Sequence, residues 1–120
     1  MSPAIQPVIM TPDLERLQIF YTALLGAEET SRVPDKGPTF FVGLRVGDAE
    51  LGLVADEDVQ IGTRQRMLLS VDVENPDDLL GRVEALGGRV LGPPKNMPWG
   101  QRVAHIEDPD GNAVNLTRQI

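Results

Sequence analysis

The sequence Thr11-Pro12-Asp13-Leu14 opens a helix-like segment, and half a chain later Asn75-Pro76-Asp77-Asp78-Leu79 opens a second one. In both stretches a residue that caps helices precedes a proline, one or two acidic residues and leucines at helical spacing. Glycine follows each segment, at Gly26 and at Gly87-Gly88, as is typical of a helix C-terminus. The two prolines are 64 residues apart (76 − 12) in a chain of 120 residues. The sequence therefore predicts an internal duplication, with one helix in each half and with Thr11 capping the first helix ahead of Pro12.

Strand-like apolar runs surround both predicted helices in the same order. One run precedes each helix, at 5–10 and 67–73, and three follow it, at 27–33, 39–46 and 49–54 in the first half and at 89–91, 102–107 and 112–118 in the second. Turns separate these runs, including a tight hairpin at Val46-Gly47-Asp48-Ala49 and a four-residue loop at Asp108-Pro109-Asp110-Gly111. The expected fold class is α+β: two βαβββ modules, at about 4–54 and 66–118, joined by a polar link at 55–65 into one domain of residues 1–120.

The composition excludes several classes of function. Apolar residues make up 41% of the chain, which suffices for a hydrophobic core at this size. The 18 acidic residues outnumber the 11 lysines and arginines, and no basic run occurs, so we expect no nucleic-acid partner. The chain has no cysteine, which removes disulfides, thiolate metal sites and cysteine nucleophiles. Because it shows neither a long apolar stretch nor a signal-peptide pattern at Met1-Ser2, we expect no membrane association and a cytoplasmic location.

Three groups of residues, in this order and spacing, resemble the vicinal oxygen chelate superfamily of glyoxalase I, bleomycin-resistance proteins and extradiol dioxygenases. They are Thr11 to Leu14 with Phe20-Tyr21, then Leu25-Gly26, then Trp99 to Arg102 with Glu107 to Asn112. The resemblance covers almost the whole chain. It implies a curved mixed sheet around a cleft, with the helices outside. Enzymes of this superfamily usually hold a divalent metal with His or Glu side chains from the first, fourth, fifth and last strands.

The four ligand positions implied by the resemblance carry residues that bind metals poorly. Counted from the nearest motifs, they are Gln6, Gly52, Arg66 and Asn115. Divalent ions need carboxylate, imidazole or thiolate ligands, and a guanidinium is not a ligand. His105 is the only histidine, so shifting the alignment by a residue supplies no other. We therefore expect no metal, no cofactor and no catalytic residue.

Several side chains are candidates for contact with a ligand instead. Trp99, the only tryptophan, lies in a loop at 93–100 and is either a structural plug or a stacking surface. Phe40 and Phe41 adjoin on one strand, so only one of them faces the core. Met97 could adapt to an apolar ligand, and Gly52 could leave room for one. His105, between Ala104 and Ile106, is interpreted as a packed strand residue rather than a catalyst.

The sequence thus favours a metal-free protein that binds a small molecule, resembling the bleomycin-resistance proteins, and that sequesters an antibiotic or another toxic compound. The expected ligand contacts are Trp99, Arg66, Asn115, Gln6, Phe41, Met97 and Gly52. The net charge of −7 favours a cationic ligand if it does more than keep the protein soluble. Two alternatives stay open: a glyoxalase- or dioxygenase-type metalloenzyme with displaced ligands, and an accessory module that binds a metabolite. Because modules of roughly 60 residues bury little surface alone, and because the family pairs modules between chains, we expect a homodimer.

Overall fold

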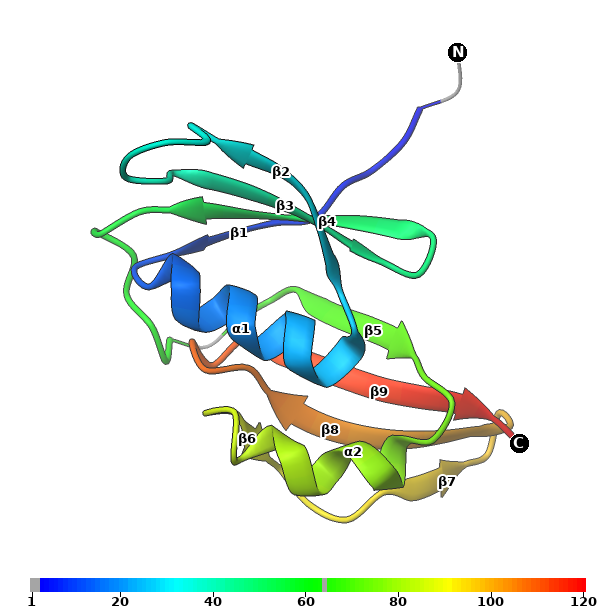
Figure 1. The fold of residues 1–120 in the computed structure, drawn as a ribbon. Helices are drawn as coiled ribbons and strands as arrows, with labels where there is room; N and C mark the ends of the chain where they lie inside the picture. The colour runs from blue at the N-terminus through cyan, green and yellow to red at the C-terminus, as the bar shows by residue number, and fades with distance from the viewer. Residues whose placement is uncertain (1–2, 64) are drawn as a thin grey trace. The chain divides into compact units, whose positions relative to one another are not determined.

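The computed structural model describes residues 3–63 and 65–120. The chain divides into two compact units, Met1–Gln60 (unit 1) and Ile61–Ile120 (unit 2), and each contains one helix and its own mixed sheet (Figure 1). This confirms the predicted α+β class and its two modules. The pattern sought at Met1-Ser2, and Arg64 of the predicted link, lie outside the described residues. Among the described residues, no helix has the length and apolar character needed to cross a membrane.

Unit 1 follows the predicted order of strand, helix and three strands. Its elements are β1 (Val8–Thr11), α1 (Leu14–Leu25), β2 (Glu28–Val33), β3 (Phe41–Val46) and β4 (Ala49–Ala55). The sheet order is β1-β4-β3-β2, in which β1 and β4 are parallel and the other neighbours are antiparallel. The parallel pair requires a crossover, which α1, β2 and β3 provide. The tight hairpin at 46–49 forms as predicted, with Gly47 at φ 60° and Val46 paired with Ala49.

The first helix begins two residues later than the sequence pattern predicts. Asp13, not Thr11, is the N-cap, and its Oδ1 accepts a hydrogen bond from the Arg16 backbone N–H at 3.1 Å. The prediction was wrong because Thr11 is the last residue of β1, where its hydroxyl instead accepts from the Asp13 N–H. At the other end Gly26 adopts φ 69° and donates to the carbonyl of Thr22, as predicted for a C-terminal glycine.

Unit 2 repeats this order with one additional strand. Its elements are β5 (Leu68–Asp72), α2 (Pro76–Val83), β6 (Arg89–Val90), β7 (Lys95–Met97), β8 (Gln101–Glu107) and β9 (Ala113–Gln119). The sheet order β5-β9-β8-β6 matches that of unit 1, again with a parallel first pair, and β7 pairs with β8 beside this path. The sequence did not predict β7, because this short strand follows two prolines and contains mostly polar residues. Asn75 caps α2 and Pro76 is its first residue, as predicted, but α2 ends at Val83, before the turn that reaches Gly87.

Strand alternation divides each sheet into a buried face and a face that points away from its own helix. The hydrophobic core of unit 1 contains Leu17, Phe20, Tyr21 and Leu24 of α1 with Val42, Leu44, Leu51 and Leu53 of the sheet. The core of unit 2 contains Val83 of α2 with Ala104, Ile106, Val114 and Leu116. We call the opposite surfaces the helix-free faces. That of unit 1 carries Val8, Met10, Phe41, Gly43, Gly52 and Val54, and that of unit 2 carries Ser70, Asp72, Val103, His105, Asn115 and Thr117.

Candidate functional site

The helix-free face of unit 1 is built around two paired glycines. Gly43 of β3 and Gly52 of β4 are Cα partners, and the Phe41 ring lies against both. A β-carbon at Gly52 would lie 3.1 Å from Cε1 of Phe41, and one at Gly43 would lie 3.6 Å from Cε2 of the same ring. Because the two glycines have no side chains, the Phe41 ring can lie directly on the sheet.

Three of the predicted site residues meet at this point. A β-carbon at Gly52 would also lie 3.5 Å from Nε2 of Gln6 and 3.1 Å from Cγ2 of Val8. Gln6 and Phe41, which come from different parts of unit 1, thus both lie beside Gly52. Gln6 precedes β1 and is exposed, whereas Phe41 is half-buried.

Around this position the surface is apolar at the centre and polar at its edge. Val8 and Met10 of the edge strand β1 are 50% and 57% exposed, so two apolar side chains lie open on this face. Charged groups stand farther along the strands, where Glu28 and Arg45 form an ion pair at 2.7 Å. The hydroxyl of Thr30 donates to Glu50 at 3.3 Å. An apolar centre with a few polar groups beside it is the usual chemistry of a small-molecule site.

The helix-free face of unit 2 has the opposite chemistry. His105 of β8 and Asn115 of β9 are Cα partners, and the imidazole Nδ1 lies 2.7 Å from the carboxamide oxygen Oδ1. Ser70 of β5 is the partner of Asn115 on the other side. One step along the strands, the Thr117 hydroxyl donates to the Asp72 carboxylate at 2.6 Å. This face therefore offers hydrogen-bonding groups where unit 1 offers apolar surface.

A cavity of about 420 Å³ opens beside the His105–Asn115 pair. It is lined by Gly62, Thr63, Gln65, Arg89, Glu107, Gly111 and Ala113. Glu107 and Ala113 are Cα partners and lie two residues along their strands from His105 and Asn115. The start of unit 2 closes one side, because the Gly62 N–H donates to the Asp110 carbonyl at 3.0 Å. Arg89 and Glu107, in the wall of the cavity, form an ion pair at 3.5 Å.

Trp99 and Met97 lie at the far end of unit 2. Trp99 is 67% exposed, so it is not a plug packed into the core. Its indole N–H donates to Oε1 of Gln101 at 2.9 Å, and Gln101 is the Cα partner of Met97 in the β7–β8 hairpin. Gln101 is four residues along β8 from His105, so the structure does not bring Trp99 and Met97 next to Asn115.

The strand pairing moves one of the four metal-ligand positions implied by the resemblance, the one on the fifth strand, from Arg66 to another residue. Asp13 and Asn75, which cap the two helices, are 62 residues apart (75 − 13), and the same shift takes Val8 to Ser70. The register agrees, because Val8 pairs with Gly52 and Ser70 pairs with Asn115. By this shift the counterpart of Gln6 (6 + 62) is Leu68, which is 50% exposed on β5, whereas Arg66 lies two residues before the strand.

These positions do not fit a divalent metal. With Leu68 in place of Arg66, the set becomes two carboxamides, a glycine and a leucine, and none of these is a usual ligand for zinc, iron or manganese. Among residues 3–63 and 65–120, no three His, Cys, Asp or Glu side chains group closely enough to hold a metal ion.

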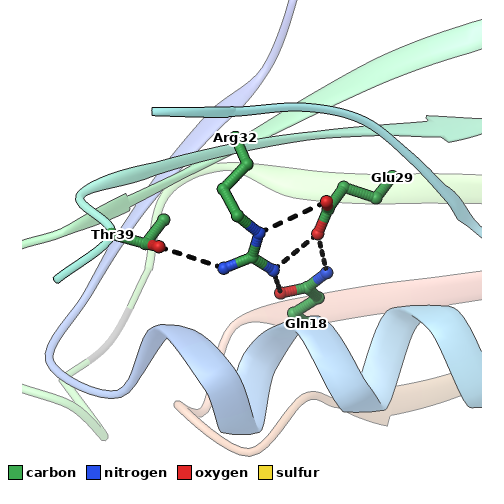
Figure 2. A network of polar contacts seen from close by, with 4 residues as sticks. All are labelled: Gln18, Glu29, Arg32 and Thr39. Atoms are coloured by element: carbon green, nitrogen blue, oxygen red, sulfur yellow. Dashed lines mark hydrogen bonds and ion pairs between the residues drawn. The ribbon is translucent and has the colours of Figure 1, made fainter. Parts of the chain in front are cut away.

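Two charged networks brace the units away from the helix-free faces. In unit 1 the Arg32 guanidinium donates to both carboxylate oxygens of Glu29, at 2.6 and 3.2 Å, and also to Gln18 and Thr39 (Figure 2). The hydrogen bonds that Glu29 accepts from Arg32 and, secondarily, from the Gln18 carboxamide lower the pKa of Glu29. In unit 2 Arg102 donates two hydrogen bonds to Asp77, which lower the pKa of that carboxyl group. Each network joins the helix to the sheet, and every group in it has a partner.

His105 is the residue that the sequence analysis undervalued. Its neighbours Ala104 and Ile106 are buried, which is the pattern that suggested a packed histidine, but His105 itself is exposed. Its partner Asn115 is ten residues away and lies on another strand. The only sequence signal that could have found the pair is the alternation of β8 and β9 around the hairpin loop at 108–111, with the register fixed.

Comparison with known proteins identifies the family. The model of the glyoxalase/bleomycin resistance protein/dioxygenase superfamily matches residues 5–116. Among solved structures, a family enzyme from Burkholderia phytofirmans PsJN has a TM-score of 0.81 at 22% identity, covering 96% of this chain and 97% of its own. TioX from Micromonospora sp. ML1 has a TM-score of 0.77 at 19% identity, covering 99% and 100%. The fosfomycin resistance protein FosX from Mesorhizobium loti has a TM-score of 0.76 at 18% identity, covering 97% and 90%.

At these identities the structural neighbours show a shared fold, and no curated protein gives a significant match. The family model spans nearly the whole chain and includes both modules. The chain therefore belongs to the glyoxalase/bleomycin resistance protein/dioxygenase superfamily.

Proposed function

We propose that this protein binds a small organic molecule without a metal ion and sequesters it, as a resistance protein that performs no chemistry would. The observation that carries the proposal is the apolar surface around Phe41. Its ring rests on two glycines, and Val8 and Met10 beside it are about half exposed. Such a surface gains free energy when an apolar ligand covers it.

The absence of a suitable donor set supports binding over metal-dependent chemistry. At the positions where superfamily enzymes carry His or Glu, this chain has Gln6, Gly52 and Asn115, with Leu68 or Arg66 at the fourth. Carboxamides can hydrogen-bond a ligand but hold divalent metals weakly. The structural similarity to a fosfomycin resistance protein supports a role in protection against a toxic compound.

The proposed ligand contacts are those predicted from the sequence. On unit 1, Phe41 and Gly52 would provide apolar contacts and Gln6 a polar one. On unit 2, Trp99 and Met97 would provide apolar contacts, and Arg66 and Asn115 polar ones. The ligand is sought first among cationic aromatic compounds, because the net charge is −7, and then among neutral and anionic ones.

We also propose that the chain is one functional domain and forms a homodimer. Each unit contains about 60 residues and leaves apolar side chains such as Met10 and Leu68 exposed. Units of this size bury a smaller fraction of their surface than larger domains do, so a partner stabilises them. Light scattering at micromolar concentration should give twice the chain mass of 13.1 kDa, and a monomer would contradict the proposal.

A pair of adjacent phenylalanines tests the site. Phe41 faces the glycine pair, and Phe40, the neighbouring residue, points to the other side of the strand and is 55% exposed. Ligands are screened by fluorescence of Trp99, the only tryptophan. Phe41→Ala should weaken binding by about tenfold or more, because covering a phenylalanine contributes roughly 1.5–3 kcal/mol. Phe40→Ala should change it little, and equal effects of the two variants would contradict the proposed site.

The metal question needs a separate measurement. The purified protein is exposed to Mn, Fe, Ni and Zn, desalted and analysed for bound metal. We expect far less than one ion per chain. Stoichiometric metal together with turnover of a hemithioacetal or a catechol would show that the protein is a metalloenzyme of the glyoxalase or dioxygenase type.

A further inference from the structure

We infer that His105 is the polar ligand contact of unit 2, that Asn115 is the positioning residue that orients it, and that the ligand donates a hydrogen bond to His105 through an uncharged hydroxyl or amide N–H. The inference rests on the proposed small-molecule binding and specifies its polar part. It reverses the sequence interpretation, in which Asn115 touched the ligand and His105 was packed in the strand.

The geometry fixes which nitrogen of His105 is available. The Asn115 oxygen Oδ1 lies 2.7 Å from Nδ1, and a carboxamide oxygen can only accept a hydrogen bond. On this ground we assign the proton to Nδ1, which leaves Nε2 of the neutral imidazole as an acceptor. Because the His105 side chain is exposed, a ligand can approach the imidazole from solvent.

The charged groups around His105 favour an uncharged hydrogen-bonding group at this contact. On β8 and β6, Glu107 and Arg89 are paired with each other at 3.5 Å. On β5, Asp72 accepts a hydrogen bond from Thr117 at 2.6 Å. Lys95 of β7 is exposed, and its Cα partner in the sheet is Val103, two residues from His105. Since an ionic group at this contact would compete with the Glu107–Arg89 pair, a hydroxyl or amide group fits better here.

The adjoining cavity has matching chemistry. Its volume of about 420 Å³ suits a small organic group, and its lining includes the Thr63 hydroxyl and the Gln65 carboxamide. Its Glu107–Ala113 row lies directly beside the His105–Asn115 row. A ligand seated there could donate to Nε2 of His105 while its remaining polar groups bind the neutral side chains of the cavity.

The first test reads the tautomer directly. His105 is the only histidine, so nitrogen-15 NMR of the imidazole, recorded at a pH where the ring is neutral, reports on this residue alone. We expect the Nδ1–H form in the wild type, its loss in Asn115→Leu, and its retention in Asn115→Asp, which keeps an acceptor oxygen. Gln119→Ala, on the same strand and face, should leave the spectrum unchanged. An Nε2–H form in the wild type, or no change in Asn115→Leu, would overturn the inference. If Asn115→Leu does not fold, the wild-type spectrum and the Asn115→Asp spectrum decide the question.

The second test uses two probes that differ only in the donor: benzyl alcohol and benzyl methyl ether. We expect the alcohol to shift the Nε2 resonance, with at least a threefold weaker affinity in Asn115→Leu, and the ether to leave Nε2 unchanged. Equal shifts from both probes would overturn the inference. Binding detected by Trp99 fluorescence without any change at His105 would overturn the inference and leave the proposed function intact. If neither probe nor any screened compound binds, the proposed function fails and the ligand assignment fails with it.

Discussion

The two units share one scaffold and carry opposite chemistry on their helix-free faces. In matching register, Val8, Gly52 and Gly43 of unit 1 correspond to Ser70, Asn115 and His105 of unit 2. One row along, Met10, Val54 and Phe41 correspond to Asp72, Thr117 and Val103. Apolar residues and glycines in the first unit thus correspond to mostly polar residues at the equivalent places in the second.

The difference between the two helix-free faces shows that packing against the helix constrains only the buried face of each sheet. The buried face must pack against its own helix, so Leu53 and Leu116, at equivalent places, are both leucine and both fully buried. The other face does not contact that helix and is free to diverge without loss of the fold. We therefore attribute the common architecture to the buried faces and the binding function to the helix-free faces.

The largest expected effect tests the shared scaffold. Leu53→Ala and Leu116→Ala each remove a fully buried side chain, and each should lower the free energy of unfolding by about 2–5 kcal/mol. Chemical denaturation measures both. If one of the two substitutions costs less than about 1 kcal/mol, the buried faces are not equivalent and the comparison fails.

The next effect comes from exchanging the two diverged positions. Gly52→Asn adds a side chain whose β-carbon alone would lie 3.1 Å from both Phe41 and Val8, so we expect a loss of about 1–3 kcal/mol by overpacking, together with loss of ligand binding. The reverse change, Asn115→Gly, should cost only about 0.5–1 kcal/mol, the usual penalty for glycine within a strand. Chemical denaturation of both variants gives their free energies of unfolding. A larger loss of stability in Asn115→Gly than in Gly52→Asn would refute the described packing around Gly52.

Trp99→Ala distinguishes contact with a ligand from support of the fold. The side chain is 67% exposed, so the free energy of unfolding should change little. If the indole stacks on the ligand, affinity should fall several-fold, because stacking contributes on the order of 1 kcal/mol. Calorimetry replaces fluorescence in this variant, which lacks the only tryptophan. Unfolding with unchanged residual binding would assign Trp99 a structural role.

The smallest effects belong to two ion pairs that join a helix-side network in each unit, Arg32–Glu29 and Arg102–Asp77. The hydrogen bonds from Arg32 and Arg102 lower the pKa values of Glu29 and Asp77 in the folded state. The stability they contribute is therefore complete above the unfolded-state pKa values and is lost as the pH falls through the folded ones. Glu29→Gln and Asp77→Asn should each lower Tm slightly at neutral pH and not at all in strong acid. A deficit that grows in acid would contradict this sign.

The sequence predicted the fold well where the signals are local. Asn75-Pro76 marks the start of α2, and Gly26 marks the end of α1, because caps and left-handed glycines act within one turn. Thr11 misled the prediction because it belongs to a strand that runs directly into the helix cap. The sequence analysis did not predict β7, because a strand of three mostly polar residues has no periodic apolar pattern.

The candidate site was harder to predict because it depends on pairing across strands. Gly52, Gln6 and Phe41 were each singled out, yet only the register shows that they meet. Arg66 was chosen by counting along the chain, and the shift between the two helix caps points to Leu68 instead. His105 and Asn115 come together only after β8 and β9 pair, so composition and local spacing could not join them.

Ligand titration of chelator-treated protein, followed by Trp99 fluorescence with and without added Mn, Fe, Ni or Zn, tests the central claim most directly. The claim is that these faces bind a small molecule without a metal. We predict saturable binding after chelation, with a Kd that does not change when any of the four ions is added. Binding or turnover that appears only in the presence of one of these ions would contradict it.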